Sequence, residues 1–161
     1  MSVSSIDKRL QDLGIELPLP ATPVASYAPF IVVGDFVYVS GQLPLSRGKM
    51  TARGRVGEEV GIEEGVRAAA LCAVNLMAQL KVACGGNLAR VRSIVRLGGF
   101  IASGKEFFDQ PVVMNGASDL FLSVFGEVGK HSRTAVGVSV LPLNAPVEVD
   151  AIVRLDRNGE R

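Results

Sequence analysis

Residues 131–153 read HSRTAVGVSVLPLNAPVEVDAIV, and this stretch constrains the structure of the chain more than any other. In two runs of the stretch apolar residues alternate with other residues, and a segment with two prolines and one asparagine separates the runs. Such alternation is typical of β-strands with one buried face, and proline with asparagine is typical of a turn. The stretch therefore predicts two antiparallel strands that form a hairpin, with its turn near Leu143 and Asn144.

Each predicted strand distributes its side chains over two faces, because successive residues of a strand point to opposite sides of a sheet. On the first strand, one face carries Thr134, Val136, Val138 and Val140, and the other carries Arg133, Ala135, Gly137 and Ser139. On the second strand, Val147, Val149, Ala151 and Val153 form the apolar face, which leaves Glu148 and Asp150 on the other. Arg133 thus lies beside small residues, where a guanidinium can bind a small carboxylate.

The predicted hairpin also separates its two charged candidates. In a simple hairpin that turns near residues 143–144, Arg133 pairs near Arg154, about six residues and therefore about 20 Å along the strand from Glu148. One hairpin cannot bring the two side chains into one pocket. If both serve one site, we expect different chains to supply them, so that activity needs an oligomer.

The composition predicts a single compact domain. The chain has 161 residues, of which 48% are hydrophobic and 20% charged, which is enough for one hydrophobic core. Its 17 basic and 16 acidic residues give a net charge of +1. Because a strong positive field is missing, we expect no nucleic-acid partner.

The sequence predicts neither a membrane segment nor a metal site. No apolar run approaches the roughly 20 residues of a membrane helix, and the N-terminal residues lack the apolar core of a signal peptide. We therefore expect a soluble, cytoplasmic protein with no membrane partner. One histidine and two cysteines offer no zinc-ligand spacing, so we expect no metal and interpret Cys72 and Cys84 as buried, unbridged residues.

The remaining elements follow from hydrophobic periodicity and from the positions of glycine and proline. We expect a peripheral helix over 4–13, an extended proline-rich segment over 18–29, a hairpin of 30–33 and 36–40, an exposed connection over 43–61, a long helix from 62 to 84, a strand over 91–102 and a helix over 110–125. Together these predict an α+β fold in which two helices cover one face of a mixed sheet.

Several of these pieces resemble the reactive intermediate deaminase family (RidA, also called YjgF or L-PSP endoribonuclease). The resemblance covers roughly residues 27–155 and depends on the order and spacing of its motifs. These are Tyr27, the sequence VYVSGQ at 37–42, the alanine-rich helix that ends in two glycines, Asn115 within a helix, Arg133 at the start of a strand, and PVEVDAI at 146–152. We expect residues 1–26 to form a helical and proline-rich extension and residues 27–157 to form a RidA-like domain.

The resemblance implies a chorismate-mutase-like fold that assembles as a homotrimer, with sheets inward and three ligand clefts between subunits. It also implies hydrolysis of reactive enamines and imines to 2-keto acids and ammonia. By resemblance, Arg133 binds the substrate carboxylate and Glu148 positions the attacking water, while Tyr27, Ser40, Gly41 and Asn115 match other pocket positions. A protonated 2-imino acid already has an electrophilic carbon, so the reaction requires no metal or organic cofactor.

Two departures from the family pattern leave the substrate open. His131 stands where many members have proline, and Ala135 stands where many have cysteine. Arg133 and Glu148 could instead form a structural ion pair, and His131 could be a turn residue. Two other functions also remain: a non-catalytic binder of small carboxylates, and a ribonuclease, which the single histidine and the net charge disfavour.

Overall fold

The computed structural model describes residues 5–20 and 26–156 of the chain. Its helices and strands follow one another as α1 Ser5–Asp12, β1 Phe30–Val33, β2 Phe36–Gln42, β3 Leu45–Ser46, β4 Lys49–Met50, α2 Ile62–Ala83, β5 Val91–Ala102, α3 Gln110–Phe125, β6 Ser132–Val138 and β7 Val147–Leu155. Short 3-10 turns precede β5, follow α3 and separate β6 from β7. The predicted bounds of α2, β5 and α3 are confirmed to within one or two residues.

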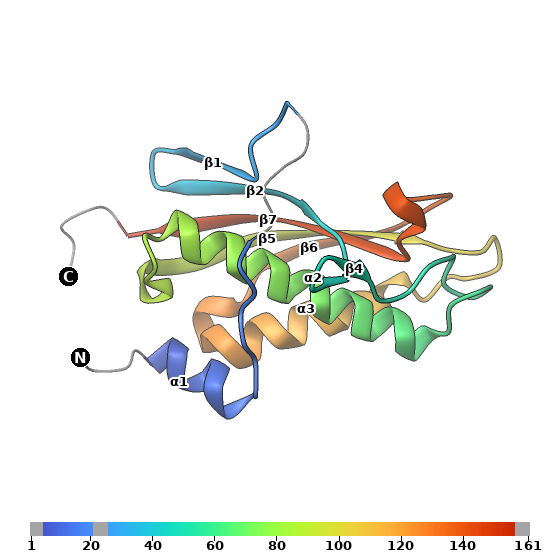
Figure 1. The fold of residues 1–161 in the computed structure, drawn as a ribbon, viewed down its shortest axis with the longest axis horizontal. Coiled ribbons are helices and arrows are strands. Elements are labelled where there is room, and N and C mark those ends of the chain that lie inside the picture. Colours follow the sequence, from blue (N-terminus) through green and yellow to red (C-terminus); the bar gives the residue numbers. More distant parts are fainter. Residues whose placement is uncertain (1–4, 21–25, 157–161) are drawn as a thin grey trace.

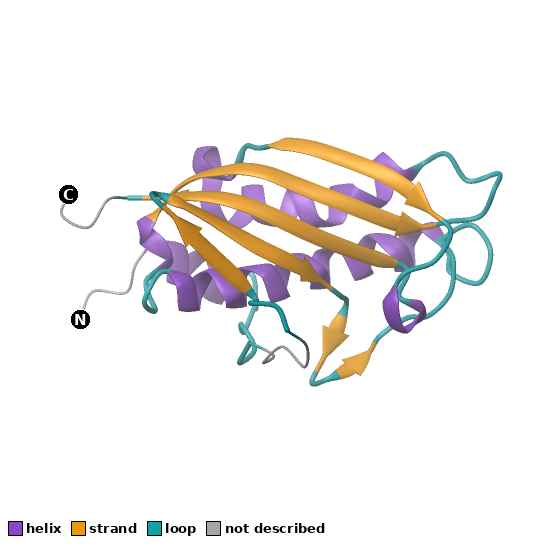
Figure 2. Ribbon diagram, turned by 90° about the horizontal axis from the view of Figure 1, so that it is seen from above, coloured by secondary structure: helices purple, strands orange, loops and turns teal. Residues whose placement is uncertain are grey.

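The core lies between one sheet and one layer of helices. Five strands form a sheet in the order β1-β2-β7-β5-β6, and α2 and α3 cover one of its faces (Figures 1 and 2). We call the other face the open face. The pair β5 and β6 is parallel and the other neighbours are antiparallel, so the sheet is mixed. The predicted α+β class, with helices on one face of a mixed sheet, is confirmed.

The predicted C-terminal hairpin is wrong, because β6 and β7 are not neighbours. Strand β5 lies between them, paired in parallel with β6 and antiparallel with β7. The elements β5, α3 and β6 form a strand–helix–strand crossover, which returns the chain parallel to β5. The chain then passes the end of β5, and Leu143 and Asn144 turn with positive φ before β7 begins. Alternation assigns side chains to faces, but it carries no information on which strand lies alongside.

Helices α2 and α3 approach each other closely because small residues line their contact. A Cβ atom at Gly116 of α3 would collide with the backbone carbonyl of Val66 of α2. Ala69 and Ala73 of α2 are fully buried. Of the described helices, α2 alone has the length and composition of a membrane span, with 50% of its apolar window buried in the protein. A core helix that packs against a sheet and a second helix, as α2 does, meets the same criteria of length and composition.

The connection over 43–61 is more ordered than its sequence predicted. It contains the short ribbon of β3 and β4, and Val56 and Val60 are fully or almost fully buried in the core. The Val56 amide donates to the Ala102 carbonyl (2.7 Å), which ties the connection to the end of β5. The sequence of this connection does not predict the attachment. Its buried valines are isolated among glycines, arginines and other polar residues, so they form no periodic pattern.

The N-terminal helix packs against the helix layer. Ile6 and Leu10 of α1 belong to the core cluster, and Arg9 Nη1 donates to the Val124 carbonyl of α3 (3.1 Å). The helix over 4–13 is confirmed for its described part, and part of the proline-rich segment lies outside the described residues. The domain boundary near residue 26 stays a prediction.

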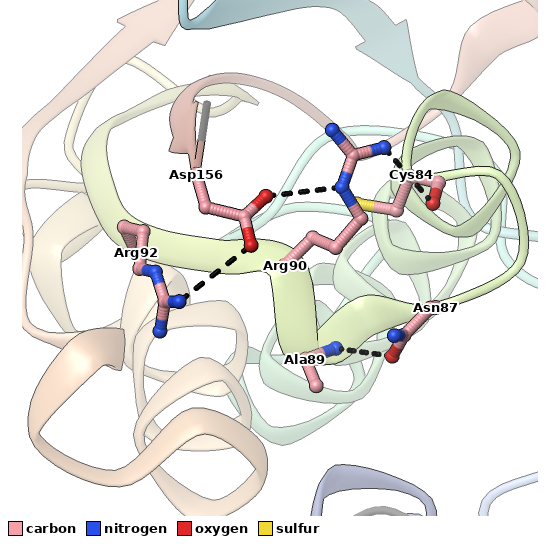
Figure 3. A network of polar contacts seen from close by, with 6 residues as sticks. All are labelled: Cys84, Asn87, Ala89, Arg90, Arg92 and Asp156. Carbon is pink, nitrogen blue, oxygen red and sulfur yellow. Dashed lines mark hydrogen bonds and ion pairs between the residues drawn. The ribbon is translucent and has the colours of Figure 1, made fainter. Parts of the chain in front are cut away.

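An ionic cluster joins the ends of three elements far from the predicted site (Figure 3). Asp156, just after β7, pairs with Arg90 Nε (3.0 Å) and with Arg92 Nη2 (3.5 Å) at the start of β5. Arg90 Nη1 also donates to the carbonyl of Cys84, directly after α2 (3.4 Å). The cluster fixes one end of the sheet against α2.

Candidate functional site

Arg133 lies on the edge strand β6, on the face that α3 covers. Its register partner on β5 is Leu97, which is fully buried beneath the helices, so both side chains point to the helix side. Arg133 Nη1 donates to Asn115 Oδ1 (2.8 Å) and to Ser118 Oγ (3.2 Å), both on α3. Asn115 and Ser118 are three residues apart and therefore share one helix face.

These two bonds leave one edge of the guanidinium open. Nη1 carries two hydrogens, and its two acceptors account for both of them. The Nε–H and Nη2–H groups, which form the planar fork that matches a carboxylate, bond to no described residue. Within residues 5–20 and 26–156, no acidic side chain forms an ion pair with Arg133. The structure therefore contradicts an Arg133–Glu148 ion pair within one chain.

Glu148 lies on the open face, at the bulge of β2. Its register partner is Phe100 of β5, and its neighbours Val147 and Val149 point to the core. Gly41 makes room for it: a Cβ atom at position 41 would overlap the Glu148 carboxylate. Partial burial raises the pKa of Glu148 above its ordinary value, and the nearby Asp150 carboxylate raises it further. Asp150 itself pairs with Arg96 (2.9 Å).

Ser40 attaches the segment before β1 to the same region. Its hydroxyl donates to the Ala28 carbonyl (2.8 Å), and its amide donates to the Pro29 carbonyl (2.9 Å). Tyr27, one residue before Ala28, is 58% exposed. Ser40, Gly41 and Glu148 therefore form one cluster on β2 and β7, with Tyr27 on the segment held beside it.

The two clusters do not meet within one chain. Arg133 and Asn115 lie on the helix side, whereas Gly41 and Glu148 lie on the open face. Positions 97 and 100 of β5, which pair with Arg133 and Glu148, are about 10 Å apart along the strand, and β6 and β7 are about 10 Å apart across it. The expected 20 Å offset along a hairpin was wrong, but the sheet itself now separates the two side chains.

Ser118 and His131 belong to the surroundings of Arg133, and the sequence did not predict that they contact each other. His131 Nδ1 lies 2.7 Å from the Gly129 carbonyl oxygen, and its Nε2 lies 2.9 Å from Ser118 Oγ. The i,i+3 spacing from Asn115 is the signal that could have indicated Ser118. His131 was interpreted as a turn residue, and nothing in its local sequence indicates a bond to α3.

The cysteines are unbridged, and Cys72 lies beneath β7, where its thiol donates to the Val147 carbonyl (3.6 Å). Cys72 and Cys84 are buried and free, which confirms their interpretation as small core residues. Burial raises the pKa of Cys84 to about 11 and the pKa of Cys72 well above its ordinary value. Among the described residues, no group of three or more metal-ligating side chains occurs. A cavity of about 670 Å³ between the segment over 14–19, the β3 region and α2 contains none of the predicted site residues.

Comparison with known proteins gives one family. Residues 7–155 match the family model described as YjgF/chorismate mutase-like, for which endoribonuclease is the suggested activity. Protein TCP17 of Trypanosoma cruzi is 46% identical over 148 residues, which cover 91% of this chain and 92% of that protein. A 2-iminobutanoate/2-iminopropanoate deaminase of Dermatophagoides farinae is 27% identical over 143 residues, or 88% and 95% of the two chains.

A solved structure extends the similarity to the backbone. The protein Atu1372 of Agrobacterium tumefaciens, whose function is described as unknown, is 49% identical to this chain. The two structures superpose with a TM-score of 0.90, over 94% of this chain and 93% of that one.

Proposed function

This chain belongs to the YjgF/chorismate mutase-like family, and from that premise we propose that it hydrolyses 2-imino acids and their enamine tautomers to 2-keto acids and ammonia. One observation carries the proposal. Arg133 presents its Nε and Nη2 hydrogens without an acceptor among the described residues, and these two groups match the two oxygens of a 2-imino acid's carboxylate.

A shared site between copies completes the proposal. The open face exposes apolar side chains on three strands, with exposed fractions of 55% for Ile31, 42% for Tyr38 and 39% for Val136. Burial of these residues against other copies favours association. We propose a homotrimer with its sheets inward, in which the edge strand β6 of one copy brings Arg133 to Glu148 on the open face of the next.

The proposed reaction needs few groups. The Arg133 fork fixes the substrate carboxylate and thereby the orientation of the adjacent iminium carbon. Glu148 accepts a proton from a water molecule as that water attacks C2. Glu148 then returns this proton to the amino group of the tetrahedral intermediate, and the C–N bond breaks to release ammonia. The hydroxyl of the intermediate loses its proton to Glu148 as it becomes the ketone of the 2-keto acid. A raised pKa makes a carboxylate a stronger base, which suits this role.

The test is a coupled assay in which an amino-acid oxidase generates 2-iminopropionate from alanine. We expect the protein to speed the formation of pyruvate and ammonia, and Arg133→Ala to lower kcat/KM by about 100-fold or more, since the substrate carboxylate loses its bidentate cationic partner. Arg67→Ala, an exposed arginine of α2, is the matched control and should behave as the parent. Equal rates for the parent and Arg133→Ala would refute the proposed role.

The other candidate functions predict different results when the same protein is assayed for pyruvate binding, imine decay and RNA cleavage. A non-catalytic binder of carboxylates would bind pyruvate through Arg133 and leave imine decay at its uncatalysed rate. A ribonuclease would cleave RNA without metal, for which this chain offers one histidine and a net charge of +1. The cytoplasmic location stays a prediction.

A further inference from the structure

We infer that Ser118 and His131 are positioning residues, which hold Arg133 so that its Nε and Nη2 hydrogens face the substrate carboxylate. The inference rests on the carboxylate site of the proposed function and concerns how that site is built. A serine of α3 and a histidine before β6 supply the contacts in this chain.

The hydrogen bonds that join His131, Ser118 and Arg133 have one consistent assignment of donors and acceptors. A carbonyl oxygen can only accept, so the 2.7 Å contact with Gly129 means that His131 Nδ1 carries a hydrogen and donates it. In the neutral ring Nε2 is then an acceptor, so the Ser118 hydroxyl donates to it over 2.9 Å. A lone pair of Ser118 Oγ remains to accept from Arg133 Nη1. Each bond polarises the next, which makes Ser118 a better acceptor for a cation.

The environment keeps this chain of bonds in place. Ser118 is 7% exposed, and the ring of His131 meets Phe121 edge to face at a centroid distance of 6.5 Å. Asn115 accepts from the same Nη1 on its exposed side (2.8 Å). With both Nη1 hydrogens used, the guanidinium plane is fixed and its free fork points away from α3.

A packing role alone would predict a different set of effects. If Ser118 and His131 merely filled space between α3 and β6, their replacement would lower stability and leave ligand affinity unchanged in the folded protein. A positioning role predicts weaker carboxylate binding at unchanged stability of the assembled protein. It also predicts that the two residues act in series, because His131 contacts Arg133 only through Ser118.

The experiment measures pyruvate binding to the full-length protein by calorimetry, together with the unfolding midpoint of each variant. We expect Ser118→Ala to weaken binding by about three- to tenfold, the effect of one lost hydrogen bond. His131→Gln should weaken it less, since Ser118 remains. The matched control is Ser123→Ala, whose hydroxyl on α3 bonds only to the Asp119 carbonyl; it should bind as the parent does.

Two further measurements separate positioning from packing. The double variant Ser118→Ala/His131→Gln should bind no more weakly than Ser118→Ala alone, whereas independent contributions would multiply. In the imine assay, Ser118→Ala should raise KM and leave kcat close to the parent value. Ser118→Thr, which restores a hydroxyl, should recover part of the lost affinity. Parental affinity for Ser118→Ala, or multiplicative effects in the double variant, would overturn the inference.

Failure of the proposed function is distinguishable from failure of this inference. A parent protein that binds pyruvate but hydrolyses no imine is no deaminase, yet the affinities of the variants still test the positioning of Arg133. A parent protein that binds no pyruvate overturns both, because no carboxylate then occupies the Arg133 fork.

Discussion

The two halves of the candidate site carry opposite charges, and their surroundings differ. On the helix side, Asn115 and Ser118 bond one nitrogen of Arg133, a cation that has no acidic partner in the described chain. On the open face, Glu148 lies in a gap left by Gly41, with a second carboxylate nearby and no cation bonded to it among the described residues. The first half is organised by hydrogen bonds, and the second is held in an unfavourable electrostatic setting.

This difference indicates that neither half is complete alone. A group of negative charge would stabilise Arg133, whose Nε and Nη2 hydrogens are free of described acceptors. A group of positive charge would stabilise the ionised form of Glu148. Because the sheet separates them among the described residues of one chain, the proposed assembly supplies each half with its partner from another copy. Three experiments test this comparison, in order of decreasing effect.

The largest effect concerns mixed assemblies. Arg133→Ala and Glu148→Gln should each abolish most imine hydrolysis, and neither variant supplies an intact pair by itself. If neighbouring copies share a site, subunits of the two variants mixed one to one should regain about a quarter of the parental activity, because random assembly gives that fraction of intact interfaces.

The assay mixes unfolded variants, refolds them together and measures pyruvate formation. Refolding each variant separately is the control and should give no recovery. An inactive mixture with a trimeric mass, about 51 kDa for chains of 17.0 kDa, would contradict a site shared between copies. A mass near that of one chain would contradict the assembly itself.

An intermediate effect concerns the gap at Gly41. In Gly41→Ala the new methyl group overlaps the Glu148 carboxylate and displaces it, so we expect kcat/KM to fall by at least tenfold. The overpacking should also lower the free energy of unfolding by about 1–3 kcal/mol. Gly61→Ala is the matched control, because a Cβ atom there meets open space at negative φ. Parental activity in Gly41→Ala would separate Glu148 from the reaction.

The smallest effect concerns stability against pH. The pKa of Glu148 is raised in the folded chain, so the unfolded chain loses this proton first as pH rises. The stability that the protonated group confers is therefore full below its ordinary pKa of about 4.3 and is lost as pH rises through the higher folded value.

Arg133→Ala removes the cation that the proposed neighbouring copy supplies. In that background Glu148→Gln, which stays neutral, should accordingly raise the stability at pH 7, and the difference should vanish near pH 4. Urea unfolding at several pH values measures this, with the exposed Glu106→Gln as control. If Glu148→Gln lowers the stability at pH 7 in the Arg133→Ala background, Glu148 has a favourable partner other than Arg133 in the folded protein.

Local patterns predicted the elements and their faces well. Hydrophobic periodicity, together with the positions of glycine and proline, predicted α2, β5 and α3 with almost their observed bounds. Gly34 lies at the predicted turn between β1 and β2. Alternation placed Glu148 and Asp150 away from the core and Arg133 on the same face as Ala135. These features follow from the chain itself, since side-chain direction in a strand or helix depends only on neighbouring residues.

The neighbours of each element came from tertiary structure alone. No pattern in residues 131–153 indicates that β5 separates the two strands, because strand pairing joins residues that are distant in sequence. For the same reason the bond between His131 and Ser118, and the opposite faces of Arg133 and Glu148, appear only when α3 and β5 are in place. Sequence periodicity therefore determined which groups are exposed on each element, whereas long-range packing determined which of them meet.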